Sequence, residues 1–361
     1  MYSYNRTRHK FITSSKLYHP MNITESELFR SEDLGVLKTF HLKRFWDKTM
    51  KKRAGIIPQD AFIEEWTTDT KLLNILGVGL EQTIIYLYNE APDFSAFEKW
   101  ILQLNNGILP EERINAFNAT FSTENASESS TKIDQILSDA DIQFWEQNGY
   151  VILRNAVSKE DCDAVITALT ELLSIDLNNP ATWYNEHPDR QGIMIQLFQH
   201  PAIEKNRNSA RIRAAYEQLW NRTDLWVSTD RVGFNPPENE NWKFPGPYLH
   251  WDVSLELPIP FGLQGLLYLS DTQANQGAFS LVPGFQNRIE DWINSLPAGT
   301  DPRKENLYEL GVAPIAANAG DFIIWHQALP HGSSRNTSHL PRMVQYINYS
   351  PIDAEVKTNW K

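Results

Sequence analysis

The second half of the chain is a series of short apolar runs separated by Gly, Pro and Asn, and this pattern constrains the fold most. The runs lie at 194–198, 225–234, 249–255, 262–269, 278–282, 322–325 and 343–349. Runs of this length, bounded by turn-forming residues, are typical of β-strands rather than helices. Their regular spacing predicts a mainly β domain, a barrel or sandwich, with one helical insert at 288–296.

The chain before residue 190 has apolar residues mostly at helical spacing instead. Predicted helices cover 34–53, 61–66, 71–76, 80–88, 93–104, 133–148 and 158–173, and a short strand is expected at 150–153. Residues 119–131 are rich in Ser, Thr, Asn and Glu, which is typical of a linker. We therefore expect an N-terminal helical region, residues 1–130, of unknown role, and a second domain over 131–361. The helices of the first region offer a surface for a homodimer.

Composition excludes several classes of function. The net charge of −12 argues against a nucleic-acid surface or a broad polyanion site. The single cysteine, Cys162, permits no internal disulfide and favours a reducing, cytoplasmic location. The sequence shows neither a secretory signal nor an apolar run long enough to span a membrane. The basic residues within 38–53 indicate either a docking helix or, as we favour, a surface helix packed against an acidic body.

His250 and Asp252 form a candidate metal-binding pair. In an extended strand they point to the same side, and Trp251 points to the other. A second histidine would complete the two-histidine, one-carboxylate face of non-haem Fe(II) oxygenases. His331 is placed for this role after the predicted strand 322–325, with His326 as its rival. Each histidine also fits an ordinary place in the core, and the short motif alone has low specificity.

Arg342 is a candidate anion-binding residue. It follows His331 by 11 residues and begins the predicted strand that ends the barrel. A guanidinium that faces the inside of a barrel needs an anionic partner, because an unpaired buried charge is costly. A dicarboxylic cosubstrate would supply a carboxylate for its planar fork. The alternative is an internal or surface ion pair.

Several motifs in order along the chain resemble the phytanoyl-CoA dioxygenase family over residues 135–350. They are Phe144-Trp145-Glu146-Gln147-Asn148-Gly149-Tyr150-Val151, His250-x-Asp252, Gly277-Ala278, Val282-Pro283-Gly284-Phe285, Ala319-Gly320-Asp321-Phe322, His331-Gly332-Ser333 and Arg342. The resemblance implies an Fe(II)/2-oxoglutarate oxygenase on a double-stranded β-helix, a jelly-roll or cupin-like barrel with flanking helices. Residues 1–130 lie outside it.

The resemblance also implies roles for single residues. His250, Asp252 and His331 would bind Fe(II). Arg342 would hold the distal carboxylate of 2-oxoglutarate with help from Ser333. Val232, Gln264 and Leu266 would line the cosubstrate pocket, although each also suits the barrel core. Candidates for contact with the substrate are Arg231, Trp251 and Trp325, followed by Trp183 and Tyr184; for the aromatics core packing is the competing interpretation, and for Arg231 an ion pair.

The expected reaction couples 2-oxoglutarate and O2 to hydroxylation of a C–H bond, with release of succinate and CO2. Asp252 occupies the position that related halogenases leave to a small residue, so the resemblance argues against halogenation. The acidic chain makes a CoA thioester less attractive as the substrate. The resemblance implies hydroxylation of a free amino acid or a specialised-metabolite intermediate, so we expect a small polar metabolite. Alternatives are desaturation or cyclisation by the same centre, a metal-dependent hydrolase, and a non-enzymatic barrel that serves as an interaction or assembly module.

Overall fold

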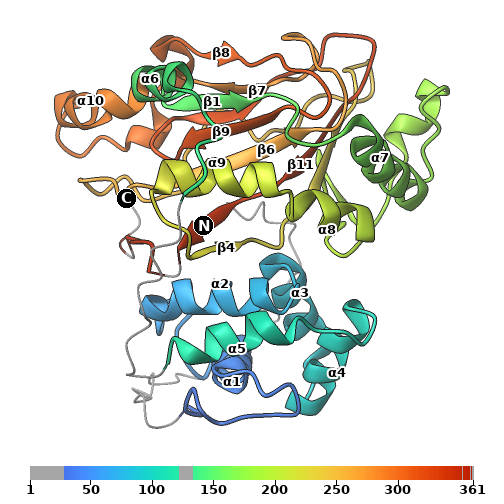
Figure 1. Ribbon diagram of the computed structural model, residues 1–361, viewed down its shortest axis with the longest axis vertical. Coiled ribbons are helices and arrows are strands. Elements are labelled where there is room, and N and C mark those ends of the chain that lie inside the picture. Colours follow the sequence, from blue (N-terminus) through green and yellow to red (C-terminus); the bar gives the residue numbers. More distant parts are fainter. Residues whose placement is uncertain (1–27, 122–132, 352, 358, 360–361) are drawn as a thin grey trace, which may run out of the picture. The chain divides into compact units, whose positions relative to one another are not determined.

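The computed structural model describes residues 28–121, 133–351, 353–357 and 359 (Figure 1). Within them the chain forms two compact units, one with residues 28–72 and 80–121, the other with 73–79 and the residues from 133 onward. The domain boundary near residue 130 stays a prediction, because most of the predicted linker 119–131 lies outside the described residues.

The first unit is helical, as the apolar spacing predicts. It contains α1 (Leu42–Arg53), the 3-10 turn η2 (Ile63–Glu65), most of α2 (Trp66–Ile75), α3 (Leu80–Glu90), α4 (Phe94–Leu104) and α5 (Glu111–Ala119). The helix predicted from residue 34 begins only at Leu42. Its N-cap, His41, has a left-handed φ of 65°, and Lys38 has a φ of 52°, so the backbone cannot extend the helix backward. A homodimer through this unit stays a prediction.

Two of the basic residues of α1 are buried in an ion network rather than presented to a partner. Lys48 Nζ lies 2.5 Å from Glu65 Oε2 and 2.7 Å from Asp69 Oδ2, and Arg44 Nη2 lies 2.6 Å from Glu65 Oε1. His41 Nε2 completes the group, 3.0 Å from Asp69 Oδ1. Burial raises the pKa of Glu65, but hydrogen bonds from Arg44 and Lys48 outweigh it and hold that pKa below its usual value. The Lys48 ammonium thus occupies the position that a cation would take between the two carboxylates.

Replacing Lys48 by Met should destabilise the first unit strongly. The Lys48 side chain is 2 % exposed, and its loss leaves two largely buried carboxylates short of a counter-charge, at a cost of about 3–5 kcal/mol. Lys51, on the same helix, makes an i,i+4 pair with Asp47 and is 23 % exposed, so Lys51→Met should cost no more than about 0.5 kcal/mol. Urea unfolding followed by circular dichroism measures both, and equal losses would contradict the prediction.

The second unit is built on a seven-stranded sheet in which all neighbouring strands are antiparallel. The strand order is β1-β9-β6-β11-β5-β3-β2. The strands are β1 (Tyr150–Leu153), β9 (Phe322–His326), β6 (Leu263–Tyr268), β11 (Arg342–Tyr346), β5 (Val232–Asn235), β3 (Met194–Ile195) and β2 (Arg190–Gln191). Because side chains alternate along a strand, the sheet has two faces, and each face packs into its own hydrophobic cluster.

Helices cover the first face. The elements before and between the strands are α6 (Asp139–Asn148), α7 (Lys159–Leu173), η3 (Pro180–Tyr184), α8 (Pro201–Arg207) and α9 (Ala210–Trp220). Apolar residues of α7, α8 and α9 pack with Val232, Leu267, Phe322 and Met343 of the sheet. As predicted, Ser158 caps α7, with its hydroxyl accepting from the Asp161 N–H at 3.1 Å. The helices therefore close this face.

Cys162 lies on the covered side of α7 and should be inert in the folded protein. Its side chain is fully buried, and burial raises the pKa of the thiol to about 12. At pH 8 the reactive thiolate is then a fraction on the order of 10⁻⁴. We expect no reaction with a thiol-disulfide reagent at pH 8 and one thiol per chain after unfolding in guanidinium. Rapid labelling of the native protein would contradict this burial.

The second face of the large sheet packs against a three-stranded sheet of order β10-β7-β8. Its strands are β10 (His331–Ser333), β7 (Phe279–Leu281) and β8 (Ala313–Pro314), with η4 (Phe285–Asn287), α10 (Ile289–Ser295), η5 (Pro302–Lys304) and η6 (Leu307–Leu310) between β7 and β8. A two-stranded sheet pairs β12 (Tyr349–Pro351) with β4 (Leu225–Val227). The molecule is thus mixed helix and antiparallel sheet, and the expected jelly-roll barrel is not closed.

The strand predicted at 249–255 is wrong. His250 forms only an isolated bridge to His331, and the residues after it form a loop. Prolines at 247, 258 and 260 lack a backbone N–H, so the chain before and after His250 has fewer donors and forms a β-bridge with β10 only at His250. The run 225–234 is also interrupted, into β4 and β5, and the run 194–198 keeps strand geometry only at Met194–Ile195. Among the described residues, no helix is long and apolar enough to cross a membrane.

Candidate metal centre

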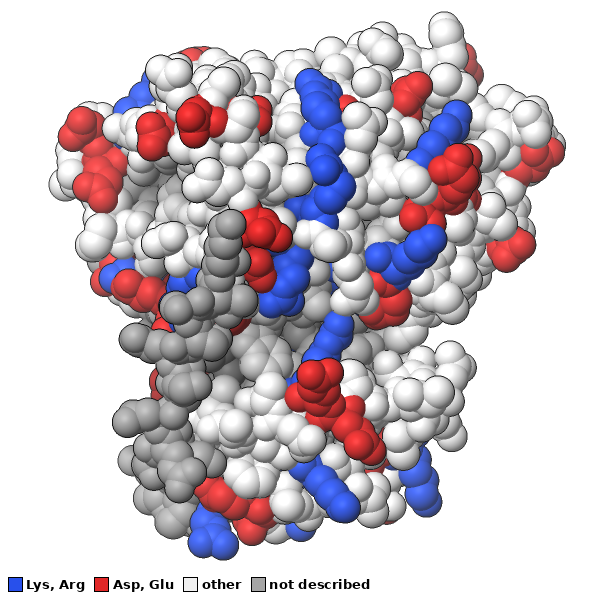
Figure 2. Space-filling view, viewed as in Figure 1, with Lys and Arg blue, Asp and Glu red and all other residues white. Residues whose placement is uncertain are grey.

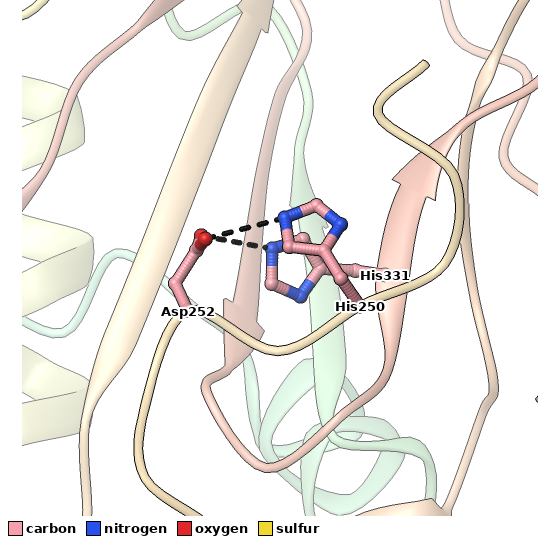
Figure 3. A group of neighbouring side chains, drawn as sticks. All are labelled: His250, Asp252 and His331. Atoms are coloured by element: carbon pink, nitrogen blue, oxygen red, sulfur yellow. Dashed lines mark hydrogen bonds and ion pairs between the residues drawn. The ribbon is translucent and has the colours of Figure 1, made fainter. Parts of the chain in front are cut away.

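His250, Asp252 and His331 converge on one point although the first two are not on a strand (Figure 3). His250 Nε2 lies 3.2 Å from Asp252 Oδ1, and His331 Nε2 lies 3.3 Å from Asp252 Oδ2. One ligand atom from each residue lies within 4.8 Å of the other two. His331 is 5 % exposed, whereas His250 and Asp252 are 32 % and 30 % exposed, so the group is closed on one side and open on the other.

Backbone pairing brings the two histidines together. His331 belongs to β10, which pairs with β7 so that His331 lies opposite Leu281. On its other edge, His250 N donates to His331 O at 2.9 Å, and His331 N donates to His250 O at 3.0 Å. The imidazole centroids are 4.8 Å apart. The two histidines are 81 positions apart in the sequence, but this backbone pairing places their segments side by side.

Each imidazole is oriented by a backbone carbonyl. His250 Nδ1 lies 2.6 Å from Tyr248 O, and His331 Nδ1 lies 3.0 Å from Leu329 O. A carbonyl can only accept, so each Nδ1 must carry the hydrogen, and in the neutral ring the lone pair is then on Nε2. Both Nε2 atoms face Asp252. In this tautomer Nε2 is available to bind a metal ion, and the backbone carbonyls hold each ring in that orientation.

Charge and burial act in opposite directions on these groups. Burial lowers the pKa of His250, but the hydrogen bond to Asp252 and its charge outweigh burial, so the pKa of His250 is raised. Burial likewise raises the pKa of Asp252, and the two histidines outweigh it, so that pKa lies well below the usual range. Asp252 is therefore held as a carboxylate, the form that binds a metal.

Gln264 contacts the carboxylate ligand directly. Its Nε2 donates to Asp252 Oδ2 at 2.8 Å, and its Oε1 accepts from Trp325 Nε1 at 3.1 Å. The predicted position of Gln264 on the inner face of its strand agrees with this contact, but the side chain serves Asp252. Trp325, a predicted substrate residue, is 2 % exposed and lies behind the centre, with its ring centroid 5.1 Å from that of His331.

Arg342 is fully buried, and none of its three guanidinium nitrogens has a hydrogen-bond partner among the described residues. It lies on the same face of β11 as Val344 and Tyr346, the face toward the metal cluster. Tyr346 lies beside it; burial raises the pKa of that phenol, and the charge of Arg342 acts in the opposite direction. Arg342 makes no ion pair among the described residues, and a buried cation without a counter-charge is costly, so this position suits an anion.

The structure corrects two further predictions. Val232 pairs with Gln345, and its side chain packs in the helix-covered cluster, so it lies on the face of the sheet away from Asp252. Leu266 does lie on the inner face, with Gln264. Trp251 is 2 % exposed, donates to Ala328 O at 2.8 Å and packs against Phe285, so it is a core residue rather than part of an open pocket.

The other candidate residues are placed as follows. Ser333 is buried on β10, two residues from His331 and on the same side of the strand. Arg231 lies 3.5 Å from Asp230 and over the ring of Phe198, which favours a structural ion pair. Trp183 is buried in the helix-covered cluster, and Tyr184 bonds the Pro237 carbonyl.

His326, the rival ligand, is excluded from the cluster by strand alternation. It lies on β9 next to Trp325 and so points to the other face of the sheet, between Trp145 and Phe261. Its Nδ1 accepts from the Ala328 N–H at 3.0 Å. Burial lowers its pKa to about 4, so it stays neutral near pH 7.

Two residues that contribute to the site were not identified from the sequence. Asn235 lies directly across from Arg342 in the β5–β11 register, is fully buried and has an Oδ1 without a partner among the described residues. Arg303 donates to the carbonyls of Trp251, at 2.9 Å, and Val253, one on each side of Asp252. No short motif marks either residue, because each contacts a segment that is distant in the sequence and adjacent only in the folded protein.

The donor set fits the expected group. Two imidazole nitrogens and one carboxylate give the facial arrangement that suits iron(II) and leaves further positions open. An unpartnered buried guanidinium on the same side of the sheet suits a carboxylate of a cosubstrate. Together, this fold and this site define a class: proteins with one metal ion held by two histidines and a carboxylate on an antiparallel sheet scaffold.

Comparisons with known proteins identify the family. The model of the phytanoyl-CoA dioxygenase (PhyH) family matches residues 145–344. A Dictyostelium discoideum protein named for phytanoyl-CoA dioxygenase is 24 % identical over 261 residues, which is 58 % of this chain and 74 % of that protein. The ectoine dioxygenase of Bordetella bronchiseptica is 19 % identical over 244 residues, 62 % of this chain and 78 % of that protein.

Among solved structures, EctD from S. alaskensis in its apoform has a TM-score of 0.47 at 18 % identity and covers 65 % of this chain and 84 % of its own. The carbocyclase SnoK from nogalamycin biosynthesis has a TM-score of 0.45 at 20 % identity, covering 62 % and 87 %.

The chain belongs to the phytanoyl-CoA dioxygenase family. It is accordingly an oxygenase that depends on iron and 2-oxoglutarate, and the expectation of these cofactors is confirmed. The family match begins at Trp145 and ends at Val344, so the helical first unit lies outside it.

Proposed function

We propose that the protein hydroxylates an unactivated C–H bond of a small metabolite, a free amino acid or a specialised-metabolite intermediate, with release of succinate and CO2. The observation that carries the proposal is Arg342, a fully buried guanidinium without a partner among the described residues, on the same side of the sheet as a His-Asp-His cluster. A metal site alone would also serve a hydrolase. A dedicated carboxylate-binding position beside it favours an oxygenase that uses 2-oxoglutarate.

In this proposal each residue has a defined task. His250, Asp252 and His331 hold the metal, which together with 2-oxoglutarate and O2 supplies the oxidising power for C–H cleavage. The carbonyls of Tyr248 and Leu329 keep both imidazoles in the ligating tautomer. Arg342 binds the distal carboxylate of 2-oxoglutarate, with Ser333 as its assistant. Leu266 forms an apolar wall of the same pocket.

Asp252 also bears on the outcome. Because a carboxylate is present in the ligand set, no ligand position is left for a halide in its place, which favours hydroxylation over halogenation. Desaturation and cyclisation use the same centre and differ in how the substrate lies. The exposed sides of His250 and Asp252 mark the side from which a substrate would approach.

A small substrate is favoured by the charge pattern. The chain carries a net charge of −12. On the face shown in Figure 2, basic and acidic side chains are interspersed rather than gathered into a basic field. A CoA thioester carries several phosphates and would be bound most readily by such a field. Two relatives are named as ectoine dioxygenases, which supports a small metabolite as the substrate class.

The test is succinate formation by the purified full-length chain with Fe(II), 2-oxoglutarate, O2 and a panel of amino acids and small metabolites. A substrate should raise succinate above the uncoupled background and yield a product heavier by one oxygen atom. A product lighter by two hydrogens would establish desaturation or cyclisation instead. Turnover without O2 would favour the hydrolase. Absence of Mn(II) and 2-oxoglutarate binding in a calorimetric titration would favour the interaction module and end the proposal.

A further inference from the structure

The loop that carries Asp252 is held by a segment distant in sequence. Residues 251–253 have no strand partner, so their carbonyls need donors from elsewhere. Arg303, on η5, supplies them: Nη1 donates to Trp251 O at 2.9 Å and Nη2 donates to Val253 O. One planar guanidinium thus holds the peptide groups on both sides of the carboxylate ligand.

A second residue of the same segment lies beside the start of the loop. The phenol of Tyr308, on η6, lies near the backbone of Leu249, the residue before His250, and this backbone acts to lower the phenol's pKa against the larger effect of burial, which raises it. Arg303 is itself anchored, because its backbone N–H donates to Asp301 Oδ1 at 3.1 Å, which caps η5. The 297–310 segment therefore contacts the metal-binding loop before His250 and on both sides of Asp252.

We propose that Arg303 is a positioning residue for Asp252, which sets the affinity and geometry of the metal site without touching the metal. Gln264 donates to the carboxylate of Asp252, and Arg303 donates to the backbone carbonyls of the residues before and after it, so both the side chain and the flanking backbone are restrained. Groups that orient a ligand typically contribute 10–100-fold to metal affinity. This inference rests on the proposed function, since it takes the His-Asp-His cluster as the metal site.

The experiment measures Mn(II) affinity of the full-length chain by electron paramagnetic resonance of the free ion, with thermal unfolding of the metal-free protein alongside. Arg303→Gln should weaken Mn(II) binding at least about tenfold. Arg303→Lys keeps the charge but lacks the fork, and should lie between wild type and Arg303→Gln. Tyr308→Phe, which loosens only the start of the loop, should weaken binding less than Arg303→Gln.

Arg288→Gln is the matched control. Arg288 donates to Leu310 O at 2.7 Å at the far end of the same segment and makes no contact with the metal loop in the described residues. It should shift the unfolding temperature as Arg303→Gln does, but leave Mn(II) affinity within twofold of wild type. If Arg303→Gln binds Mn(II) within twofold of wild type, or no more weakly than Arg288→Gln, the inference is overturned.

Two further outcomes keep the result decisive. Should Arg303→Gln fail to fold, Arg303→Lys decides alone, and wild-type affinity in that variant overturns the inference. Should wild-type protein itself bind no Mn(II), the proposed metal site fails. Wild-type binding together with unaltered binding in the Arg303 variants would remove only the role of Arg303 and leave the proposed function standing.

Discussion

His331→Ala should abolish metal binding and, with it, succinate formation. His331 is 5 % exposed and provides the inner nitrogen of the cluster, 3.3 Å from Asp252 Oδ2. Its removal leaves one imidazole and one carboxylate, and the space it vacates is walled by the rings of Phe279 and Trp325, neither of which can replace it. We expect Mn(II) affinity to fall by more than about 100-fold, beyond the loss that follows when only a ligand's support is removed.

His326→Gln is the matched control, because His326 belongs to the preceding strand and faces the other side of the sheet. It is neutral near pH 7, with a pKa lowered to about 4 by burial. Its substitution should lower stability and leave Mn(II) affinity unchanged. Calorimetric titration of both variants decides the matter. Retention of wild-type affinity by His331→Ala, or an equal loss in His326→Gln, would show that the cluster is not the metal site.

Much of this site could be predicted because the types of its residues indicate the chemistry. Histidines, a carboxylate and an arginine that follow one another across short apolar runs have few joint uses, and the family match spans all four residues. The alternation of Gln264, Leu266 and Tyr268 along β6 also follows from strand geometry alone. These features depend on local periodicity and composition, which a sequence contains in full.

The predictions that were wrong depended on pairing between segments that are distant in the sequence. The run 249–255 has the apolar alternation of a strand, yet its carbonyls bond to the side chain of Arg303 in place of a neighbouring strand. Val232 has the right residue type for a pocket wall, but its register opposite Gln345 turns it toward the helices. A shift of one residue reverses the face of every side chain, and sequence periodicity does not fix that register for a continuous apolar run.

Arg342→Met should make the protein more stable and, at the same time, unable to use 2-oxoglutarate. Without the cosubstrate, Arg342 is a buried charge whose three nitrogens have no hydrogen bonds among the described residues. A methionine of similar length removes the cost of burying this charge, so the free energy of unfolding should rise by about 1–4 kcal/mol. Loss of a charge-assisted pair should weaken 2-oxoglutarate binding by about 2–5 kcal/mol, roughly 30-fold to several thousand-fold.

Arg207 offers the opposite case in the same sheet domain. It is 1 % exposed, as buried as Arg342, but it donates to the carbonyls of Phe198 and Asp230 and pairs with Glu204. Arg207→Met should therefore destabilise the protein, because it leaves those acceptors without a donor. Chemical unfolding with and without 2-oxoglutarate, in the presence of Mn(II), separates the two arginines.

Wild-type protein should gain stability from 2-oxoglutarate, and Arg342→Met should gain none, since a ligand stabilises only the state that binds it. If both substitutions destabilise equally, Arg342 has a structural partner and its role as a carboxylate site is lost. If Arg342→Met stabilises but still binds 2-oxoglutarate, the anchor lies elsewhere. The expected combination, higher stability without cosubstrate binding, would mean that the fold keeps an unfavourable buried charge because function requires it.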